Sequence, residues 1–234
     1  MIKAVFFDLY HTLLRYEPPR EELLAEALWG LGIDVKPEAL HLPMVAADEF
    51  IYEEIACQPL GQRSEQGRTE LYAQHQRVVL EEAGIEASEK LVLSLLGKMR
   101  TAKMKLVLFD DVLPALTELK RRGLVLGLIS NVDRDITSLL ADVGLSGLLS
   151  VVVTSQNAGV NKPQPGIFQT ALERAGIQAA EAVYVGDQYR VDVGGAKGAG
   201  LKGVLLDRND YYRDVTDAPR IHSLSEMPGL LESI

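Results

Sequence analysis

The chain has 234 residues, of which 47% are hydrophobic and 24% are charged, and its formal net charge is −9 at pH 7. This length accommodates one large domain, or a main domain with a smaller accessory one, and the composition is ordinary for a soluble globular protein. The acidic balance, without any basic run, argues against a nucleic-acid-binding or an anionic-membrane-binding protein.

The cysteine content and the N-terminal segment indicate the cellular compartment of the protein. The single cysteine, Cys57, cannot form an internal disulfide, and no Cys/His spacing typical of a metal site occurs. The first apolar run is cut short by Asp8, which is too early for a signal peptide. No apolar stretch reaches the length of about 18 residues that a transmembrane helix needs. We therefore predict a cytoplasmic protein, monomeric or homodimeric, without a nucleic-acid or membrane partner.

The chain opens with an apolar run over residues 4–9 that predicts a buried strand. The segment that follows, residues 16–102, contains no convincing strand run. Four helix-like segments lie in it: residues 19–32, 37–56, 65–84 and 88–100. A helical block inserted after the first strand of an α/β domain predicts a cap domain, so residues 1–15 and 103–234 would form the core domain.

Strand-like and helix-like segments alternate through the rest of the chain. Continuous apolar runs predict strands that are covered on both faces: residues 124–130, 150–155, 182–187 and 202–207. The predicted helices are residues 111–123, 133–145 (with Asp133 as the N-cap), 165–177 and 189–201. This alternation predicts βαβ units and an α/β fold with a doubly wound parallel sheet.

Polar side chains that could take part in catalysis or ligand binding follow the ends of these strands. In open α/β sheets, ligands bind beyond the carboxyl ends of the strands. The residues are Asp8, Ser130, Asn131, Lys162, Asp187 and Asp192. Each by itself is typical of a turn or a helix cap. Their occurrence at successive strand ends predicts one crevice with a carboxylate nucleophile, a hydroxyl donor, a cation and further carboxylates.

In these residues and their order the sequence resembles the haloacid dehalogenase (HAD) superfamily. The similar segments are DLYHTL at 8–13, LISN at 128–131, Lys162 with PQPGIF, and VGDQYRVDVGGAKGAG at 185–200. The resemblance covers residues 1–14 and about 104–207, and it implies a Rossmann-like core. A cap between the first and second motifs corresponds to type C1 in this family.

The resemblance implies a hydrolase in which Asp8 attacks an electrophile and forms a covalent aspartyl intermediate. Lys162 would neutralise the charge around Asp8 and a bound phosphoryl group. Ser130 Oγ and the backbone N–H of Asn131 would bind phosphoryl oxygens, and the hydroxyl of Thr12 would hold the turn around Asp8.

The implied cofactor is Mg²⁺, which prefers oxygen ligands and keeps several waters, so that a few carboxylates suffice. The implied ligands are Asp8, the backbone carbonyl of Tyr10 and Asp187. Asp192 would support the metal's waters and orient Lys162. The implied activity is a phosphatase for a small phosphorylated metabolite.

Tyr10 departs from the phosphatase pattern, in which a second Asp stands two residues after the nucleophile, protonates the leaving alcohol and then activates water. A tyrosine side chain has a pKa of about 10, so it can donate a hydrogen bond but is a poor base. Substrates with good leaving groups, such as acyl or aryl phosphates, would need the missing acid less. His11 is an alternative proton donor, because imidazole titrates near neutrality, or else a surface or packing residue.

Two other functions stay open. Tyrosine at this position is also typical of 2-haloacid dehalogenases, whose halide leaving group needs no proton. These enzymes work without metal, and their fourth motif typically has Ser and Asn, so Asp187 and Asp192 count against this alternative. They also hold the halide with an early cap arginine, and neither Arg15 nor Arg20 stands in a matching context. The third hypothesis is a non-catalytic binding or regulatory protein, which only the missing acid/base supports.

The glycine-rich stretch GGAKGAG at residues 194–200 does not meet the order of a dinucleotide-binding loop and does not directly follow a strand. It predicts close packing of a helix on the sheet instead.

Overall fold

The computed structural model describes residues 1–234, which divide into two compact units. The α/β unit comprises Met1–Arg15 and Val107–Ile234, and the helical unit comprises Tyr16–Leu106. The chain passes between the units along β2 (Leu14–Glu17) and β3 (Lys105–Leu108), which form a two-stranded sheet.

The sequence patterns did not predict β2 and β3. The segments LRYE and KLVL contain charged residues and are mostly half-buried, so they lack the buried apolar run that identified β1 and β5, which have the same length. Pairing across about 90 intervening residues is a tertiary event, so these two strands exist because the fold brings them together.

A six-stranded sheet with the order β5-β4-β1-β6-β7-β8 forms the centre of the α/β unit. The strands are β1 (Ala4–Phe7), β4 (Val125–Ser130), β5 (Val151–Thr154), β6 (Ala182–Gly186), β7 (Lys202–Leu206) and the short edge strand β8 (Arg220–Ile221). Every pair in the sheet is parallel. This confirms the predicted α/β fold with a doubly wound parallel sheet, to which only β8 is an unpredicted addition.

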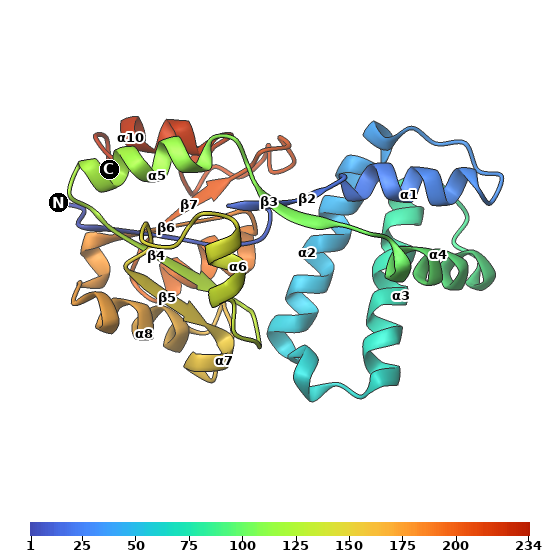
Figure 1. Cartoon of the computed structure of the whole chain (residues 1–234), viewed down its shortest axis with the longest axis horizontal. Coiled ribbons are helices and arrows are strands. Elements are labelled where there is room, and N and C mark those ends of the chain that lie inside the picture. The colour runs from blue at the N-terminus through green and yellow to red at the C-terminus, as the bar shows by residue number, and fades with distance from the viewer. The chain divides into compact units, whose positions relative to one another are not determined.

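Helices cover both faces of the sheet. In Figure 1, α5 (Val112–Arg121) and α10 (Met227–Leu230) lie together on one face, and α8 (Pro165–Ala175) lies on the other. α9 (Gly195–Gly198) packs beside α8, in an apolar cluster that also contains Phe6 of β1. The shorter segments are α6 (Thr137–Asp142), α7 (Ser155–Ala158), the 3-10 turns Ala179–Glu181 and Leu224–Glu226, and the π-helical turn Tyr189–Gly194.

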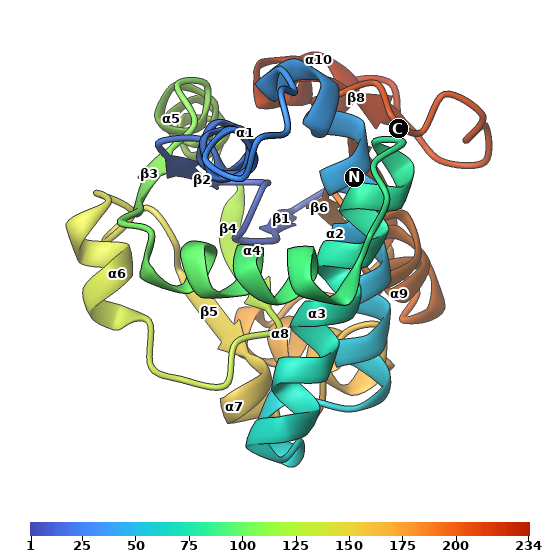
Figure 2. The same cartoon turned by 90° about the vertical axis from the view of Figure 1, so that its right-hand side faces the viewer.

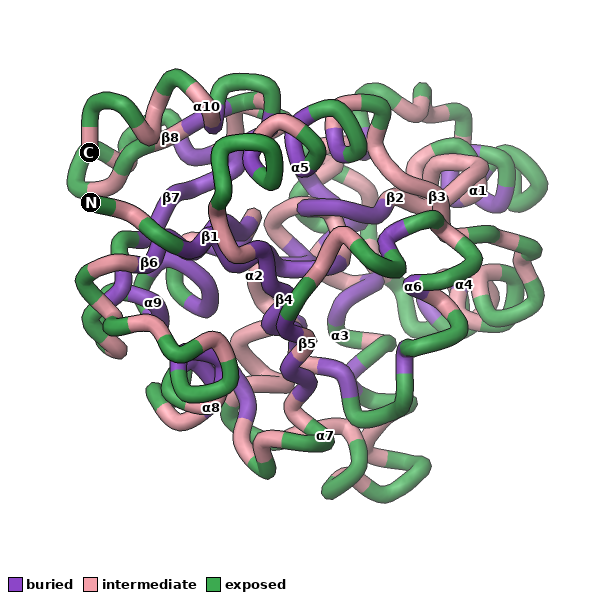
Figure 3. Tube along the Cα trace, turned by 60° about the vertical axis from the view of Figure 1, so that its left-hand side comes forward, coloured by how far each residue is buried: buried purple, intermediate pink, exposed green.

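The interior strands of the sheet are buried, as continuous apolar runs predict for strands covered on both sides (Figure 3). Packing at the centre is tight. A Cβ atom added at Gly127 of β4 would lie 2.4 Å from the ring of Phe6 in β1. Glycine is therefore required here by the close approach of the phenylalanine ring to the neighbouring strand.

The register of the sheet brings its polar strand ends together. Phe7, the last residue of β1, lies opposite Leu128 of β4 and Val185 of β6. Because all the strands run in the same direction, their carboxyl ends share one edge. Asp8 and Asp187 follow directly after β1 and β6, so both lie at this edge.

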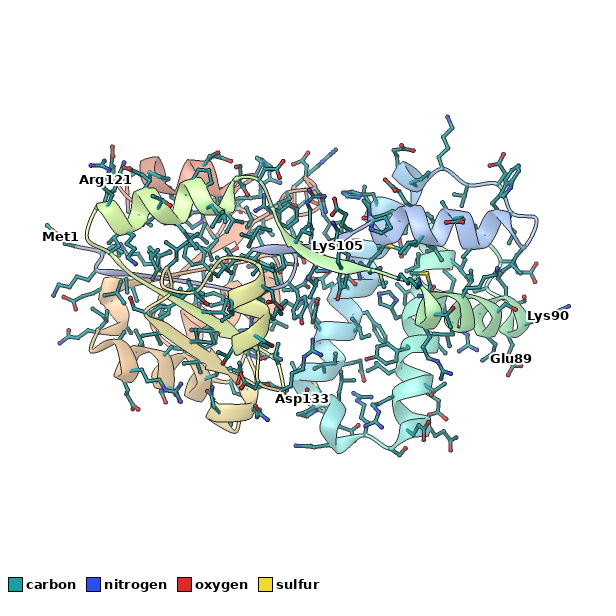
Figure 4. All side chains as sticks on the ribbon, in the orientation of Figure 1. Met1, Glu89, Lys90, Lys105, Arg121 and Asp133 are labelled. Carbon is teal, nitrogen blue, oxygen red and sulfur yellow. The ribbon has the colours of Figure 1, made fainter.

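The helix predicted over residues 133–145 starts later than expected. α6 begins at Thr137, whose backbone N–H and hydroxyl donate to Asp135 Oδ1 at 2.8 and 2.7 Å. Asp135 thus satisfies a free N–H of the first turn, as an N-terminal capping residue does. Asp133, the predicted cap, lies in the exposed loop between β4 and α6 (Figure 4). The prediction of Asp133 as the cap was wrong, because the N-cap position is Ile136 and Asp135 binds the first N–H of the helix.

The helix predicted over residues 189–201 is divided into the π-helical turn Tyr189–Gly194 and α9. The backbone N–H groups of Asp192 and Val193 both donate to the carbonyl oxygen of Gln188, at 2.9 and 3.3 Å. The second of these bonds spans five residues and gives the turn its π character.

Close packing does occur at Gly195, but against α8 and the segment before it, and not against the sheet as predicted. A Cβ atom there would lie 2.9 Å from Pro163 Cα and 3.0 Å from the ring of Phe168. The contact is with the segment that leads into α8 and with α8 itself, so the glycine serves helix packing.

The helical unit contains the four predicted helices. They are α1 (Arg20–Trp29), α2 (His41–Cys57), α3 (Glu65–Glu82) and α4 (Glu89–Thr101), with 3-10 turns at Pro37–Leu40 and Leu60–Gln62. α2 and α3 run side by side (Figure 2), and α4 packs on both α3 and α1. Buried leucines such as Leu24, Leu28, Leu80 and Leu95 give this unit a hydrophobic core of its own. None of the protein's helices combines the length and the apolar character needed to cross a membrane.

Candidate active site

Asp8, the predicted nucleophile, directly follows the central strand β1. Its backbone N–H donates to the carbonyl oxygen of Val185 at 2.9 Å, which continues the pairing with β6 by one residue. The residue is only 7% exposed, and Oδ1 accepts a hydrogen bond from Lys162 Nζ at 2.6 Å. Lys162 thus holds the carboxylate through Oδ1, and the backbone N–H of Leu9 donates a further hydrogen bond to it.

Lys162 is the centre of the hydrogen-bond network at this edge. It lies between α7 and α8 and is 3% exposed. Its ammonium donates to Asp8 Oδ1 at 2.6 Å, to Asp192 Oδ1 at 2.7 Å and to the Tyr184 hydroxyl at 2.8 Å. Burial by itself lowers the pKa of Lys162, but the charges of Asp192 and Asp8 outweigh burial and raise it. The side chain is therefore a protonated cation between two carboxylates.

Asn131 fixes the backbone of this lysine. The Lys162 N–H donates to Asn131 Oδ1 at 2.7 Å, and Asn131 Nδ2 donates to the Lys162 carbonyl oxygen at 3.0 Å. The side chain of Asn131 is thus committed to a two-point clamp between the end of β4 and the Lys162 loop. Sequence reasoning considered only the backbone N–H of Asn131 and missed this clamp, because a contact across 31 residues leaves no local signal.

Asp192 is held from both sides. Its Oδ2 accepts from the backbone N–H of Gln188 at 3.0 Å, its Oδ1 accepts from Lys162, and it is 1% exposed. A Cβ atom added at Gly186 would lie 2.3 Å from Asp192 Oδ2 and 2.6 Å from its Cβ. The glycine that precedes Asp187 therefore makes the space that this carboxylate fills.

Asp187 completes a cluster of acids. One carboxylate oxygen each from Asp8, Asp187 and Asp192 lie within 4.8 Å of one another. Thr12 Oγ1 donates to Asp187 Oδ1 at 3.4 Å, and Gln188 Nε2 donates to Asp187 Oδ2 at 3.0 Å. The Thr12 hydroxyl thus ties the loop after β1 to the end of β6.

The acid cluster has more negative charge than Lys162 neutralises. Burial, together with the charge of Asp192, raises the pKa of Asp8 to about 6 despite the opposing effect of Lys162. Burial and the charges of Asp192 and Asp8 raise the pKa of Asp187 well above its usual range. A divalent cation relieves this kind of repulsion, and a set of carboxylate oxygens is the ligand type that Mg²⁺ prefers.

The loop after β1 carries the residues next to the nucleophile. The Tyr10 hydroxyl accepts a hydrogen bond from Arg134 Nη2 at 3.4 Å. His11 has φ 61°, in the left-handed region, so the backbone turns sharply immediately after Tyr10. The carbonyl oxygen of Thr12 accepts from Arg208 Nη2 at 3.0 Å, which anchors the far end of the loop.

Ser130 is the last residue of β4, beside β1 in the sheet, and it is 2% exposed. Its hydroxyl makes no hydrogen bond to the acids or to Lys162. The structure therefore brings five predicted residues into one hydrogen-bonded network: Asp8, Thr12, Lys162, Asp187 and Asp192. Asn131 supports this network through its bonds to the Lys162 backbone. Ser130 stands at the same strand edge outside this network.

Sequence reasoning missed Tyr184. Its hydroxyl accepts from Lys162 and lies 3.0 Å from the carbonyl oxygen of Ile129 and 3.2 Å from Asp192 Oδ1. Burial and the charges of Asp192 and Asp8 raise its pKa well above the usual value, so the phenol keeps its proton. A usable signal was present, because a tyrosine inside a fully buried apolar strand needs a partner for its hydroxyl.

Known proteins share this sequence pattern. The family model for haloacid dehalogenase-like hydrolases matches residues 2–200. The glyceraldehyde 3-phosphate phosphatase of Methanopyrus kandleri is 31% identical over 218 residues, which cover 90% of this chain and 86% of that protein. Haloacid dehalogenase-like hydrolase domain-containing protein 3 of Danio rerio is 39% identical over 127 residues, which are 53% of this chain and 52% of that protein.

Solved structures share the fold. A HAD phosphatase from Thermococcus onnurineus is 28% identical, with a TM-score of 0.57 and 98% of both chains covered. A 2-haloacid dehalogenase from Pseudomonas syringae pv. Tomato DC3000 is 26% identical, with a TM-score of 0.57 and 100% of this chain and 99% of that chain covered. These likenesses include both a phosphatase and a dehalogenase. The family model matches most of the chain, and the motifs and the site agree with that match. The chain therefore belongs to the haloacid dehalogenase-like hydrolase family.

Proposed function

We propose that this protein is a Mg²⁺-dependent phosphatase that hydrolyses a small phosphorylated metabolite through an aspartyl-phosphate intermediate on Asp8. The observation that carries the proposal is the cluster of Asp8, Asp187 and Asp192, with carboxylate oxygens within 4.8 Å of one another beside a single lysine. A site that works on halide without a metal has no need for this excess of buried negative charge. The phosphatase named among the relatives of this chain is consistent with the proposal.

In the proposed reaction, Asp8 Oδ2 forms a bond to phosphorus while the bond from phosphorus to the leaving-group oxygen breaks, with its electron pair passing to that oxygen. Lys162 holds Asp8 Oδ1 and offsets the charge of the phosphoryl group. Bound through Asp8, Asp187 and the carbonyl of Tyr10, Mg²⁺ would supply further positive charge beside the phosphoryl oxygens. Water then hydrolyses the acyl phosphate and restores Asp8.

Tyr10 narrows the class of leaving group. Its hydroxyl accepts a hydrogen bond from Arg134, and a phenol can in turn donate a hydrogen bond to a leaving-group oxygen. No carboxylate base stands at this position, so proton transfer has less help than in phosphatases with Asp there. We infer a preference for acyl or aryl phosphates over alkyl phosphates, with His11 as the nearest alternative proton donor in sequence.

The alternative is a 2-haloacid dehalogenase, favoured by Tyr10 and by the likeness to the Pseudomonas structure. A dehalogenase of this kind needs an early arginine whose guanidinium can bind the halide. The guanidinium of Arg20 is bonded to both carboxylate oxygens of Asp48, and Arg15 lies 3.9 Å from Asp110. Both early arginines are thus engaged by acids within their own units, which weighs against this alternative.

The test is an assay against acetyl phosphate, p-nitrophenyl phosphate and a metabolite panel, with and without Mg²⁺, and against (S)-2-chloropropionate. Asp8→Asn is the control. Mg²⁺-dependent phosphate release that is lost in Asp8→Asn supports the proposal. Metal-independent halide release would overturn it in favour of the dehalogenase, and ligand binding without turnover would favour a non-catalytic binding protein.

Three further predictions accompany the proposal. We expect the helical unit to act as a cap that selects the substrate. We also expect a cytoplasmic protein that is a monomer or a homodimer. Finally, we expect no nucleic-acid or membrane partner, in line with the net charge of −9.

A further inference from the structure

The Tyr184 hydroxyl lies among the charged groups of the site, although the residue belongs to the apolar strand β6. The side chain is fully buried. Phe168 of α8 packs edge-on against its ring, with the centroids 5.2 Å apart and the planes at 83°. The position of the hydroxyl is therefore set by the packing of the core.

The hydroxyl supplies the third acceptor for the Lys162 ammonium. An ammonium has three N–H donors, and here they point to Asp8, Asp192 and Tyr184. Two of these acceptors are anions, and Coulomb attraction alone would draw the cation toward the carboxylates. The neutral third acceptor fixes the direction of the remaining N–H bond and hence the position of the nitrogen.

The same hydroxyl reaches the end of β4. Its single proton can be donated to the carbonyl oxygen of Ile129 at 3.0 Å, and that carbonyl belongs to the peptide bond that leads into Ser130. Tyr184 thus joins the lysine to the strand end that carries the predicted phosphoryl-binding residues. A single buried side chain connects β6, the Lys162 loop and β4.

We propose that Tyr184 is the positioning residue of the Asp8–Lys162 pair, holding the ammonium between Asp8 and Asp192 and in register with the end of β4. The kinetic consequence of this assignment rests on the proposed phosphatase function, whereas the position of the ammonium does not. Removing the hydroxyl leaves one buried N–H of Lys162 without an acceptor, so the ammonium shifts toward the carboxylates and changes the setting of the nucleophile.

The kinetic test compares Tyr184→Phe with the wild type on acetyl phosphate at saturating Mg²⁺. We expect kcat to fall by about 10- to 100-fold, which is typical when a residue that orients a reacting group without touching the substrate is lost. KM should change less than about threefold. Tyr212→Phe, the same substitution at another buried tyrosine of the α/β unit, should leave both constants unchanged. Equal kcat values for Tyr184→Phe and the wild type would overturn the proposal.

A second readout needs no turnover. A buried, fully hydrogen-bonded ammonium exchanges its protons slowly, so ¹H–¹⁵N spectra of lysine side chains should show Lys162 in the wild type, assigned by its loss in Lys162→Met. The Lys162 signal should move or broaden in Tyr184→Phe and stay in place in Tyr212→Phe. An unmoved signal in Tyr184→Phe would overturn the assignment. A moved signal together with a wild type that hydrolyses no phosphate would reject the proposed function and keep the role of Tyr184.

If Tyr184→Phe fails to fold, the wild-type protein still carries the test. The ammonium protons of Lys162 should show a nuclear Overhauser contact with the Tyr184 ring protons adjacent to the hydroxyl. The absence of that contact, with the Lys162 signal present, would overturn the proposal.

Discussion

At the scale of single residues, Tyr10 distinguishes this site from a phosphatase with a paired aspartate. The side chain has the proton to give to a leaving group but lacks a carboxylate that could take one back from water. Replacing it by Asp would restore that function at the same point of the loop.

We therefore expect Tyr10→Asp to raise the turnover of alkyl phosphates by about 10-fold or more, because general acid–base help is worth about 10²–10⁴ in rate. Acetyl phosphate turnover should change much less, since its leaving group departs without a proton. The measurement is steady-state phosphate release with both substrate types. Tyr10→Asn is the matched control, and an equal gain in Tyr10→Asn would show that the effect does not come from a carboxylate.

Asp187 should control metal binding. Saturating Mg²⁺ at about 100 times Kd stabilises a protein by about 2.7 kcal/mol, which corresponds to roughly 5–10 °C in Tm for a chain of this size. We expect this shift in the wild type and its loss in Asp187→Asn, measured by thermal unfolding in Mg²⁺ and in EDTA. Asp142→Asn, at an exposed position of α6, should keep the full shift. Equal shifts in both variants would place the metal elsewhere.

At the scale of elements, the junction of β6 with the π-helical turn explains why a glycine precedes Asp187. The turn directs the Asp192 carboxylate back toward the strand, into the space that a side chain at position 186 would otherwise occupy. The local sequence Gly-Asp-x4-Asp is thus one packing unit in which glycine and the second acid depend on each other.

We expect Gly186→Ala to displace Asp192 and, with it, the Lys162 ammonium. Overpacking of this kind destabilises a fold by about 1–3 kcal/mol. Both the free energy of unfolding in urea and phosphate release should fall. Gly198→Ala in α9 is the matched control, because nothing lies within 4 Å of an added Cβ atom there. It should be neutral or stabilising by up to about 1 kcal/mol. A Gly186→Ala variant that behaves like Gly198→Ala would refute the packing argument.

At the scale of the whole molecule, Asp111 links distant parts of the α/β unit. It stands before α5 and accepts hydrogen bonds from Arg208 at 2.8 and 3.0 Å, and from the Ser223 hydroxyl and the Leu224 N–H at 2.7 and 2.9 Å. The same Arg208 side chain donates to the Thr12 carbonyl in the loop after the nucleophile. The C-terminal segment is thus tied to the loop that carries the site.

Asp111 should make stability depend on pH in a defined direction. Burial raises its pKa, but the hydrogen bonds from Arg208 and Ser223 outweigh burial and lower it. A lowered pKa in the folded state means that the stabilisation is complete above the unfolded value of about 4 and is lost as the pH falls through the folded value.

Asp111→Asn should therefore reduce the free energy of unfolding at pH 7, by about 2 kcal/mol for hydrogen bonds to a charged group. The difference from the wild type should shrink as the pH falls toward 3, where the wild-type carboxyl is also neutral. Urea titrations at the two pH values measure this, with Asp34→Asn at an exposed position as the control. A difference that does not change with pH would contradict the account.

Some features of the protein could be predicted because they depend on neighbours along the chain. Apolar runs and helical spacing indicated the strands of the parallel sheet and the four helices of the helical unit. The polar residues at the strand ends indicated the edge of the sheet at which Asp8, Lys162, Asp187 and Asp192 meet. The order of the four motifs along the chain was sufficient to indicate the family.

Other features were decided only by the tertiary structure, because they join residues that are far apart in sequence. The clamp of Asn131 on Lys162, the hydroxyl of Tyr184 beneath the ammonium and the pairing of β2 with β3 are of this kind. Hydrophobic periodicity specifies which face of an element is buried, but not which buried polar atoms meet. These contacts between buried polar atoms follow from strand register and packing. In this protein they determine how the predicted nucleophile Asp8 and Lys162 are held.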